Sequence, residues 1–176
     1  MNSTTKRTVL SAMFLALGMI LPLLTMQIKE IGDTLLPMHI PVMLCGLICG
    51  YNYGFVVGLI LPFLRSVIWG MPPIYPNAVW MALELCTYGF VIGYLYSKSK
   101  TKTIKTVYIS LISSMICGRI VWGISKAILL GLGGKVFTLS AFVVGGFADA
   151  LAGIVLQLVI IPLIMSLHNK KYDNLC

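Results

Sequence analysis

Five charged residues interrupt the long apolar stretches of this chain: Arg65, Glu84, Arg119, Lys126 and Asp149. Only 10% of the 176 residues are charged, and most of the other charges lie in short polar breaks. A charged side chain at the centre of a bilayer costs at least about 2.5 kcal/mol, so it usually faces a cavity or an opposite charge. The pattern therefore predicts a membrane protein with a polar site inside it.

The composition supports the same class of protein. The chain is 59% hydrophobic and has a mean hydropathy of +0.96, and a spanning helix needs about 20 mostly apolar residues. We therefore expect an all-α integral membrane protein, with one domain over residues 1–176 forming a six-transmembrane-helix bundle. The predicted helices are 8–26, 36–50, 54–70, 78–96, 107–132 and 139–167. The second is short for a span and the sixth is long, so a seven-segment arrangement is the alternative.

The net charge of +8 is read as a topology signal. Lys6 and Arg7 precede the first segment, four lysines lie in the 97–106 connection, and Lys170 and Lys171 follow the sixth segment. Six spans place all of these on one side, and basic residues favour the cytoplasmic side. We therefore expect both termini in the cytoplasm, the lipid bilayer as the surroundings, and no nucleic-acid partner.

Two helix faces carry charged or amide groups beside tryptophans. Three residues of the 107–132 segment and three near the start of the 78–96 segment follow the i, i+3, i+7 spacing that places side chains on one face. They are Arg119, Trp122 and Lys126 on the first face, and Asn77, Trp80 and Glu84 on the second. Aromatic and amide groups beside charges suit a small polar ligand with a flat or branched body.

The depths of the charges favour an anionic ligand that enters from outside. A rise of about 1.5 Å per residue places Glu84, Arg119 and Asp149 near the midplane, with Arg65 and Lys126 closer to the outer surface. The cations outnumber the carboxylates, which favours a carboxylate held by a guanidinium fork or a lysine. Two alternatives stay open: Arg119 pairs with Glu84 or Asp149 only to lock the bundle, and the outer cations snorkel to the interface.

Two further candidates lie in the outer connections. His39 stands between two prolines at the start of the second segment, where it either contacts a ligand or caps the helix. Tyr75 belongs to the proline-rich stretch 71–76, which is stiff because each proline fixes its own φ and restrains the preceding residue. We expect no metal or cofactor in this chain, since Cys45 and Cys49 lack further ligands at a suitable spacing and are interpreted as small buried hydrophobes.

Small residues recur at four-residue spacing, which lets helix backbones approach closely. The pairs are Gly46 and Gly50, Gly54 and Gly58, Gly89 and Gly93, and Ala12 and Ala16. The default interpretation is internal helix packing.

Two stretches carry a resemblance to a known family. The stretch at 11–18, SAMFLALG, and the stretch at 39–54, HIPVMLCGLICGYNYG, with Gly58 after it, resemble the substrate-binding S components of energy-coupling factor (ECF) vitamin transporters. The resemblance implies a subunit of the prokaryotic cytoplasmic membrane that binds a vitamin near its outer face, against the last three helices. It also implies that Ala12 and Ala16 dock on a transmembrane coupling subunit, which acts with two ATPases.

We therefore expect a substrate-binding S component of an ECF-type ABC importer, with pantothenate or another anionic vitamin favoured and a pyridoxine-type compound next. The 27–35 connection and the proline-rich stretch would close over the ligand. No glycine-rich phosphate loop is present, so we expect no enzyme activity here, and ATP hydrolysis belongs to the partners. The alternatives are a self-sufficient carrier that relays protons through Glu84 and Asp149 and an intramembrane enzyme. The enzyme lacks support, because His39 and His168 do not form a metalloprotease motif.

Overall fold

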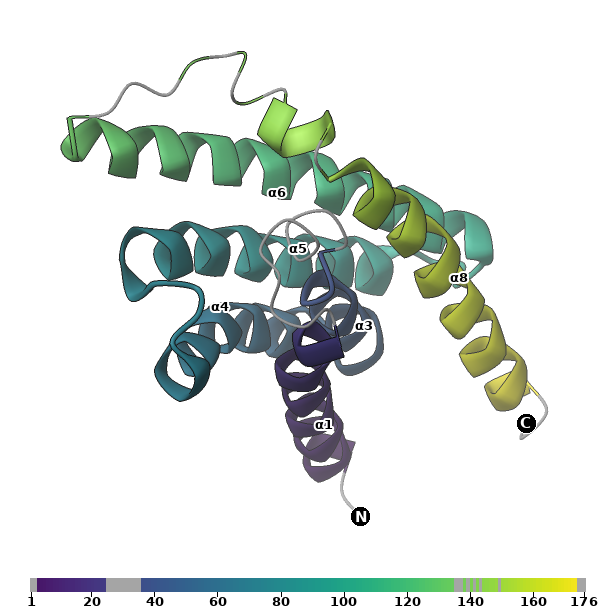
Figure 1. Ribbon diagram of the computed structural model, residues 1–176. Coiled ribbons are helices and arrows are strands. Elements are labelled where there is room, and N and C mark those ends of the chain that lie inside the picture. The colour runs from purple at the N-terminus through teal and green to yellow at the C-terminus, as the bar shows by residue number, and fades with distance from the viewer. Residues whose placement is uncertain are drawn as a thin grey trace.

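The computed structural model describes residues 3–24, 36–134, 138, 140, 142, 144–148 and 150–173. Every regular element in these residues is helical (Figure 1). In chain order the elements are α1 Ser3–Leu24, α3 His39–Cys49, α4 Tyr51–Trp69, η1 Ile74–Ala78, α5 Val79–Lys98, α6 Ile104–Leu132, η2 Val144–Ala148 and α8 Leu151–Asp173.

The prediction of an all-α membrane protein is confirmed. Five segments are long and apolar enough to cross a membrane: Thr4–Leu23, Tyr51–Trp69, Ile74–Lys98, Ile104–Leu132 and Val144–His168. The segment predicted at 36–50 is the shorter helix α3, with 11 residues. Nine of those residues are buried, so α3 is an internal helix with little surface for lipid. The cytoplasmic placement of both termini stays a prediction.

Two predicted boundaries differ from the structure. Residues 51–53, which lie between the helices predicted at 36–50 and 54–70, are helical, because α4 begins at Tyr51 and only Gly50 separates it from α3. Gly50 has a φ of 107°, a conformation that glycine adopts without steric cost, so one residue is enough to join the helices. The helix predicted at 139–167 is interrupted: Ser140 and Phe142 are helical, but the long helix α8 begins at Leu151. The short π-helix η2 precedes α8 and contains Gly145 and Gly146, and adjacent glycines weaken an α-helix.

Direct backbone contact joins α3, α4 and α5. A Cβ added to Gly54 would lie 2.6 Å from the carbonyl oxygen of Gly89, and one added to Gly93 would lie 2.6 Å from that of Gly46. A Cβ on Gly58 would likewise come within 2.5 Å of the Leu85 carbonyl oxygen. No larger residue fits at these positions without moving a helix. The predicted packing role of the small-residue spacing is confirmed for these glycines.

On its other side α5 packs against α6, and α8 starts beside the middle of α6 and crosses it obliquely (Figure 1). One apolar core cluster receives Met43 from α3, Tyr88 from α5, Met115 from α6 and Ile161 from α8. This cluster holds the four helices together and forms the layer on which the polar residues described below rest.

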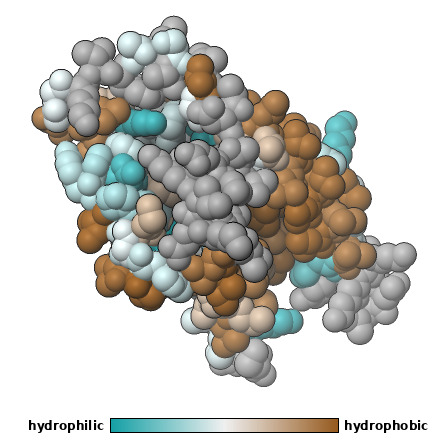
Figure 2. Space-filling model, viewed as in Figure 1, coloured by the Kyte–Doolittle hydropathy of each residue, from teal (hydrophilic) through white to brown (hydrophobic). Residues whose placement is uncertain are grey.

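The outer surface of the helices is apolar, as contact with lipid requires. On α8 the residues at every fourth position are more than half exposed, and the right-hand part of Figure 2 shows a continuous hydrophobic surface. They are Leu151, Val155, Val159, Leu163 and Leu167. In water a patch of this size would mark an interaction site, and here the bilayer accounts for it.

Replacing Gly89 by alanine tests the backbone contact. Gly89→Ala should lower the unfolding free energy by about 1–3 kcal/mol, because its Cβ would meet the backbone of Gly54 and overpacking costs roughly that amount. The measurement is thermal unfolding in detergent. Gly131→Ala is the matched control, since nothing lies within 4 Å of its added Cβ and alanine favours a helix. Equal melting temperatures for the two variants would show that the helices separate without cost.

Candidate functional site

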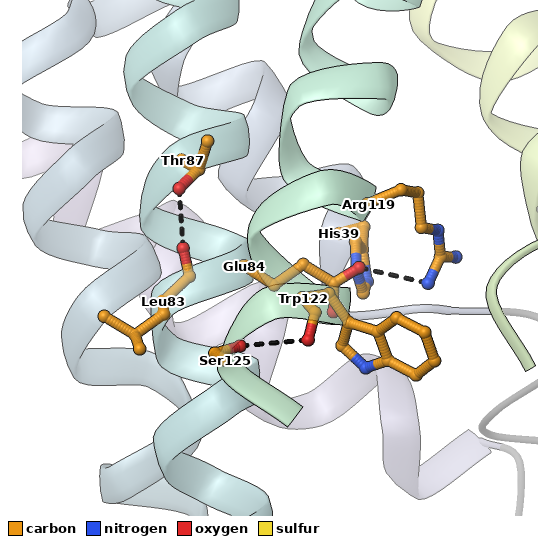
Figure 3. A network of polar contacts seen from close by, with 7 residues as sticks. All are labelled: His39, Leu83, Glu84, Thr87, Arg119, Trp122 and Ser125. Atoms are coloured by element: carbon orange, nitrogen blue, oxygen red, sulfur yellow. Dashed lines mark hydrogen bonds and ion pairs between the residues drawn. The ribbon is translucent and has the colours of Figure 1, made fainter. Parts of the chain in front are cut away.

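The carboxylate of Glu84 on α5 is the centre of a buried polar cluster (Figure 3). Its Oε1 lies 3.1 Å from Nη1 of Arg119 on α6 and 3.5 Å from Nε2 of His39 on α3. The three residues are exposed by only 2–4%. A buried charge costs several kcal/mol unless it is paired, so this ion pair is what allows both charges to stay inside the bundle.

His39 is positioned by its place at the start of α3. It is the first residue of that helix, and Pro41 follows in the first turn, where a missing N–H removes no helical hydrogen bond. The imidazole packs edge-on against Tyr88, with ring centroids 5.0 Å apart. Since Tyr88 lies one helical turn after Glu84 on α5, the same helix supports the ring and supplies its acidic neighbour.

Arg119 uses only part of its guanidinium for Glu84. Its Nε and Nη2 are buried, and they have no hydrogen-bond partner within the described part of the chain. Buried donors without an acceptor are rare in folded proteins and cost about 1–3 kcal/mol each. Two N–H donors of the same guanidinium, Nε and Nη2, are therefore available to an acceptor group from outside the chain.

A second charged group lies between two tryptophans. The Lys126 ammonium is 4.4 Å from the ring centroid of Trp122 and 5.5 Å from that of Trp80. A cation near an indole face gains about 0.5–2 kcal/mol. Trp80 precedes Glu84 by one turn on α5, and Trp122 follows Arg119 by one turn on α6. The aromatic groups thus lie one helical turn from the ion pair, toward the end of the bundle at which α5 begins and α6 ends.

Trp122 is enclosed by the segment that leads to α8. The Phe142 ring centroid is 6.1 Å from that of Trp122. A Cβ added to Gly145 or Gly146 would lie 3.3 or 3.4 Å from the Trp122 ring. The glycines therefore allow this segment to pass close to the indole and form one wall of the site.

The comparisons with known proteins identify the family. A family model described as "ECF transporter, substrate-specific component" matches residues 6–167, which is most of the chain. The chain belongs to the ECF transporter substrate-specific component family. Comparison with curated proteins gives no match, and comparison with solved structures gives none either.

As a member of the ECF substrate-specific component family, the chain is a substrate-binding component of a transporter and not an enzyme. It is a multi-pass protein of the prokaryotic cell membrane. Membership also implies a ligand and an ECF module as partners. These statements agree with the expectations drawn from the sequence.

The structure brings six of the ten predicted substrate-binding residues of this ECF component together. They are His39, Trp80, Glu84, Arg119, Trp122 and Lys126. Whether they bind the substrate stays a prediction. Of the two carboxylates proposed to pair with Arg119, Glu84 forms an ion pair with it, and Asp149 lies outside the described residues.

Within the described part of the chain, no hydrogen bond or salt bridge joins three of the other predicted residues, Arg65, Tyr75 and Asn77, directly to the ion pair. Arg65 is half-buried, and its Nη1 contacts the sulfur of Met38, the residue before His39, at 3.2 Å. Tyr75 is 60% exposed, and Asn77 is half-buried in η1. The 27–35 connection, predicted to close over the ligand, also falls outside the described residues.

Sequence reasoning missed Met38, which contacts Arg65, and Phe142, which packs against Trp122. Both are apolar residues in apolar surroundings, so neither their type nor their spacing set them apart. Pro37 before Met38 and the glycine pair after Phe142 are signals of an irregular backbone.

Ala12 and Ala16 lie on the uncovered face of α1 in this ECF component. Both are exposed, between Val9, Met13 and Leu17, which are 47–57% exposed. The opposite face of α1 packs inward, where a Cβ on Gly18 would meet the Leu61 side chain. The alanine pair is therefore free of internal packing partners among the described residues.

Separating the two charges tests the ion pair. Glu84→Gln alone should destabilise the ligand-free protein by about 3–5 kcal/mol, because it leaves the Arg119 guanidinium buried without a counter-charge. Glu84→Gln combined with Arg119→Met should recover most of this loss, since no buried charge then remains. The measurement is unfolding of all three proteins in one detergent. A double variant as unstable as the sum of the single changes would show that the charges are not coupled.

Proposed function

We propose that this ECF component captures an anionic water-soluble vitamin from outside, with pantothenate favoured, and delivers it inward. It would do so with an ATP-driven module of a transmembrane coupling subunit and two ATPases. The observation that carries the ligand class is the buried Arg119 guanidinium with two unpartnered donors, which lies beside Trp122 and close to a second cation.

The unpartnered donors of Arg119 favour an anion. Its Nε and Nη2 are buried and have no hydrogen-bond partner in the described part of the chain. Hydrogen bonds from a guanidinium to a carboxylate are charge-assisted, and a carboxylate can accept two of them at once. A ligand with a carboxylate would satisfy both donors, whereas a cationic ligand would offer them no comparable acceptor.

The aromatic groups favour a ligand with an apolar body beside its anionic group. Trp80 and Trp122 flank the Lys126 ammonium and lie about one helical turn outward of the ion pair. Small-molecule sites typically combine such apolar surfaces with a few placed polar groups. Pantothenate has a carboxylate at one end and, at the other, a branched body that carries two methyl groups between two hydroxyl groups, which fits such a site.

The exposed alanine face supports the proposed coupling partner. Small residues let a second helix approach closely, and Ala12 and Ala16 form the small patch on a face of α1 that no described helix covers. The proposal is that the transmembrane coupling subunit docks there, on the side of α1 that points away from α3 and α4.

A thermal-shift screen of the purified protein against water-soluble vitamins tests the ligand class. An anionic vitamin at 100 times its dissociation constant should stabilise the protein by about 2.7 kcal/mol. Lys126→Met should weaken the binding of that vitamin about tenfold or more, because it removes a charged contact. Lys98→Met is the matched control, since Lys98 contacts Tyr94 on the surface. Stabilisation by cationic vitamins only would contradict the ligand class.

Enlarging the alanine face tests the docking surface. Ala12→Leu combined with Ala16→Leu should leave vitamin binding unchanged, because both side chains point away from the bundle, and should abolish uptake into cells that hold the complete transporter. Ala152→Leu, an exposed alanine on α8, is the matched control and should retain uptake. Normal uptake by the double variant would place the coupling subunit elsewhere.

A further inference from the structure

Four helices each carry one buried polar residue at the same level. The core cluster contains Met43, Tyr88, Met115 and Ile161, one from each of α3, α5, α6 and α8. Four residues away, on the same helix face, stand a histidine, a glutamate, an arginine and a glutamine. They are His39, Glu84, Arg119 and Gln157, and they are 1–4% exposed.

On each of the four helices, the polar residue lies toward the same end of the bundle from its core residue. His39, Glu84 and Gln157 precede their core residues on α3, α5 and α8, whereas Arg119 follows Met115 on α6. Glu84 contacts both Arg119 and His39, so the polar residues of α3, α5 and α6 lie on the same side of the core cluster. In Figure 1, α8 crosses α6 obliquely and runs toward the end at which α6 begins, so moving from Ile161 back to Gln157 leads toward the same end of the bundle as moving from Met115 to Arg119. Gln157 therefore belongs to the layer of the ion pair.

Gln157 is the member of this layer without a role in the fold as described. It is 1% exposed, and its Nε2 has no hydrogen-bond partner in the part of the chain that the structure describes. An apolar side chain of similar size would fill the same space without burying an unpaired donor. A buried amide of this kind is expected to have a partner from outside the chain.

We infer that Gln157 is a ligand-binding residue, whose Nε2 donates a hydrogen bond to the carboxylate that Arg119 holds. The inference rests on the proposed function and deepens it. Arg119 Nε, Arg119 Nη2 and Gln157 Nε2 are all donors, so the group that satisfies them together is an acceptor with several lone pairs. A carboxylate accepts about four hydrogen bonds, and its charge strengthens those that the guanidinium donates.

This assignment also fixes the orientation of the ligand. The apolar core cluster closes the site directly inward of the layer, whereas the tryptophans and Lys126 lie outward of it. The carboxylate is therefore the innermost end of the ligand, and its apolar body extends outward along Trp80 and Trp122. A neutral amide contributes specificity here without adding a further charge to the bundle.

The experiment measures dissociation constants by calorimetry for the wild type and Gln157→Met. The probes are pantothenate, biotin and nicotinate, each beside a neutral counterpart: pantothenol, biotinamide and nicotinamide. Gln157→Met should bind the acid that the wild type prefers about tenfold or more weakly, as for a lost hydrogen bond to a charged group, and should bind its neutral counterpart as the wild type does. Met165→Leu, buried two turns inward on the same helix face, is the matched control and should bind the acid as the wild type does.

Thermal unfolding without ligand distinguishes binding from a structural role. Gln157→Met should melt at the wild-type temperature or above it, because it removes an unpaired buried donor. A lower melting temperature together with unchanged affinity for the acid would overturn the inference and leave the proposed function standing. An equal loss for the acid and its neutral counterpart would overturn the carboxylate as the group that Gln157 contacts. A wild type that binds none of the three acids would overturn the proposed ligand class, and this inference with it.

Discussion

The buried charge of Glu84 is the constraint on which the rest of the site depends. A carboxylate at 3% exposure inside an apolar bundle must be neutralised, and the pairing with Arg119 at 3.1 Å does this across the contact between α5 and α6. The attraction repays desolvation only when the geometry is good. The relative position of the two helices is therefore restricted by the pair, and His39 restricts α3 in the same way. Three helices are held at one level by a single carboxylate.

The glycines make this arrangement possible by removing freedom elsewhere. The backbones of α3, α4 and α5 touch at Gly46, Gly54 and Gly89, so these helices have little room to slide. The side of α5 that faces α6 carries larger groups, including Tyr88 and Glu84. The bundle thus divides into a closely packed part, where small residues fix the spacing, and a part with large and polar side chains, where a ligand has partners to meet.

Helical spacing predicted much of this site because charged residues are rare within membrane-spanning segments, so each one points to a specific role. In an apolar chain, a glutamate and an arginine on adjacent helices stand out, and i, i+3, i+4 spacing placed each beside its tryptophan. The spacing could not say which carboxylate pairs with Arg119, since that depends on how α5, α6 and α8 rotate about their axes. Helical spacing also could not predict that Gly50 alone joins α3 and α4. That junction depends on the positive φ of Gly50, which a hydrophobic pattern does not reveal. Gln157 escaped notice for a simple reason: an uncharged amide in an apolar helix carries a weaker signal than a charge, and its significance depends on burial.

The unpartnered donors of Arg119 link binding to the surrounding membrane. Without ligand, Nε and Nη2 of Arg119 are buried and have no hydrogen-bond partner in the described part of the chain. Under the proposed function, the carboxylate of a vitamin accepts hydrogen bonds from these two donors. The cost of keeping a polar cluster among apolar helices is then lower with ligand than without it, because buried donors without an acceptor are costly. Ligand binding and tolerance of the low-dielectric surroundings are thus favoured by the same interaction, and a carboxylate serves both purposes better than a neutral group of the same shape.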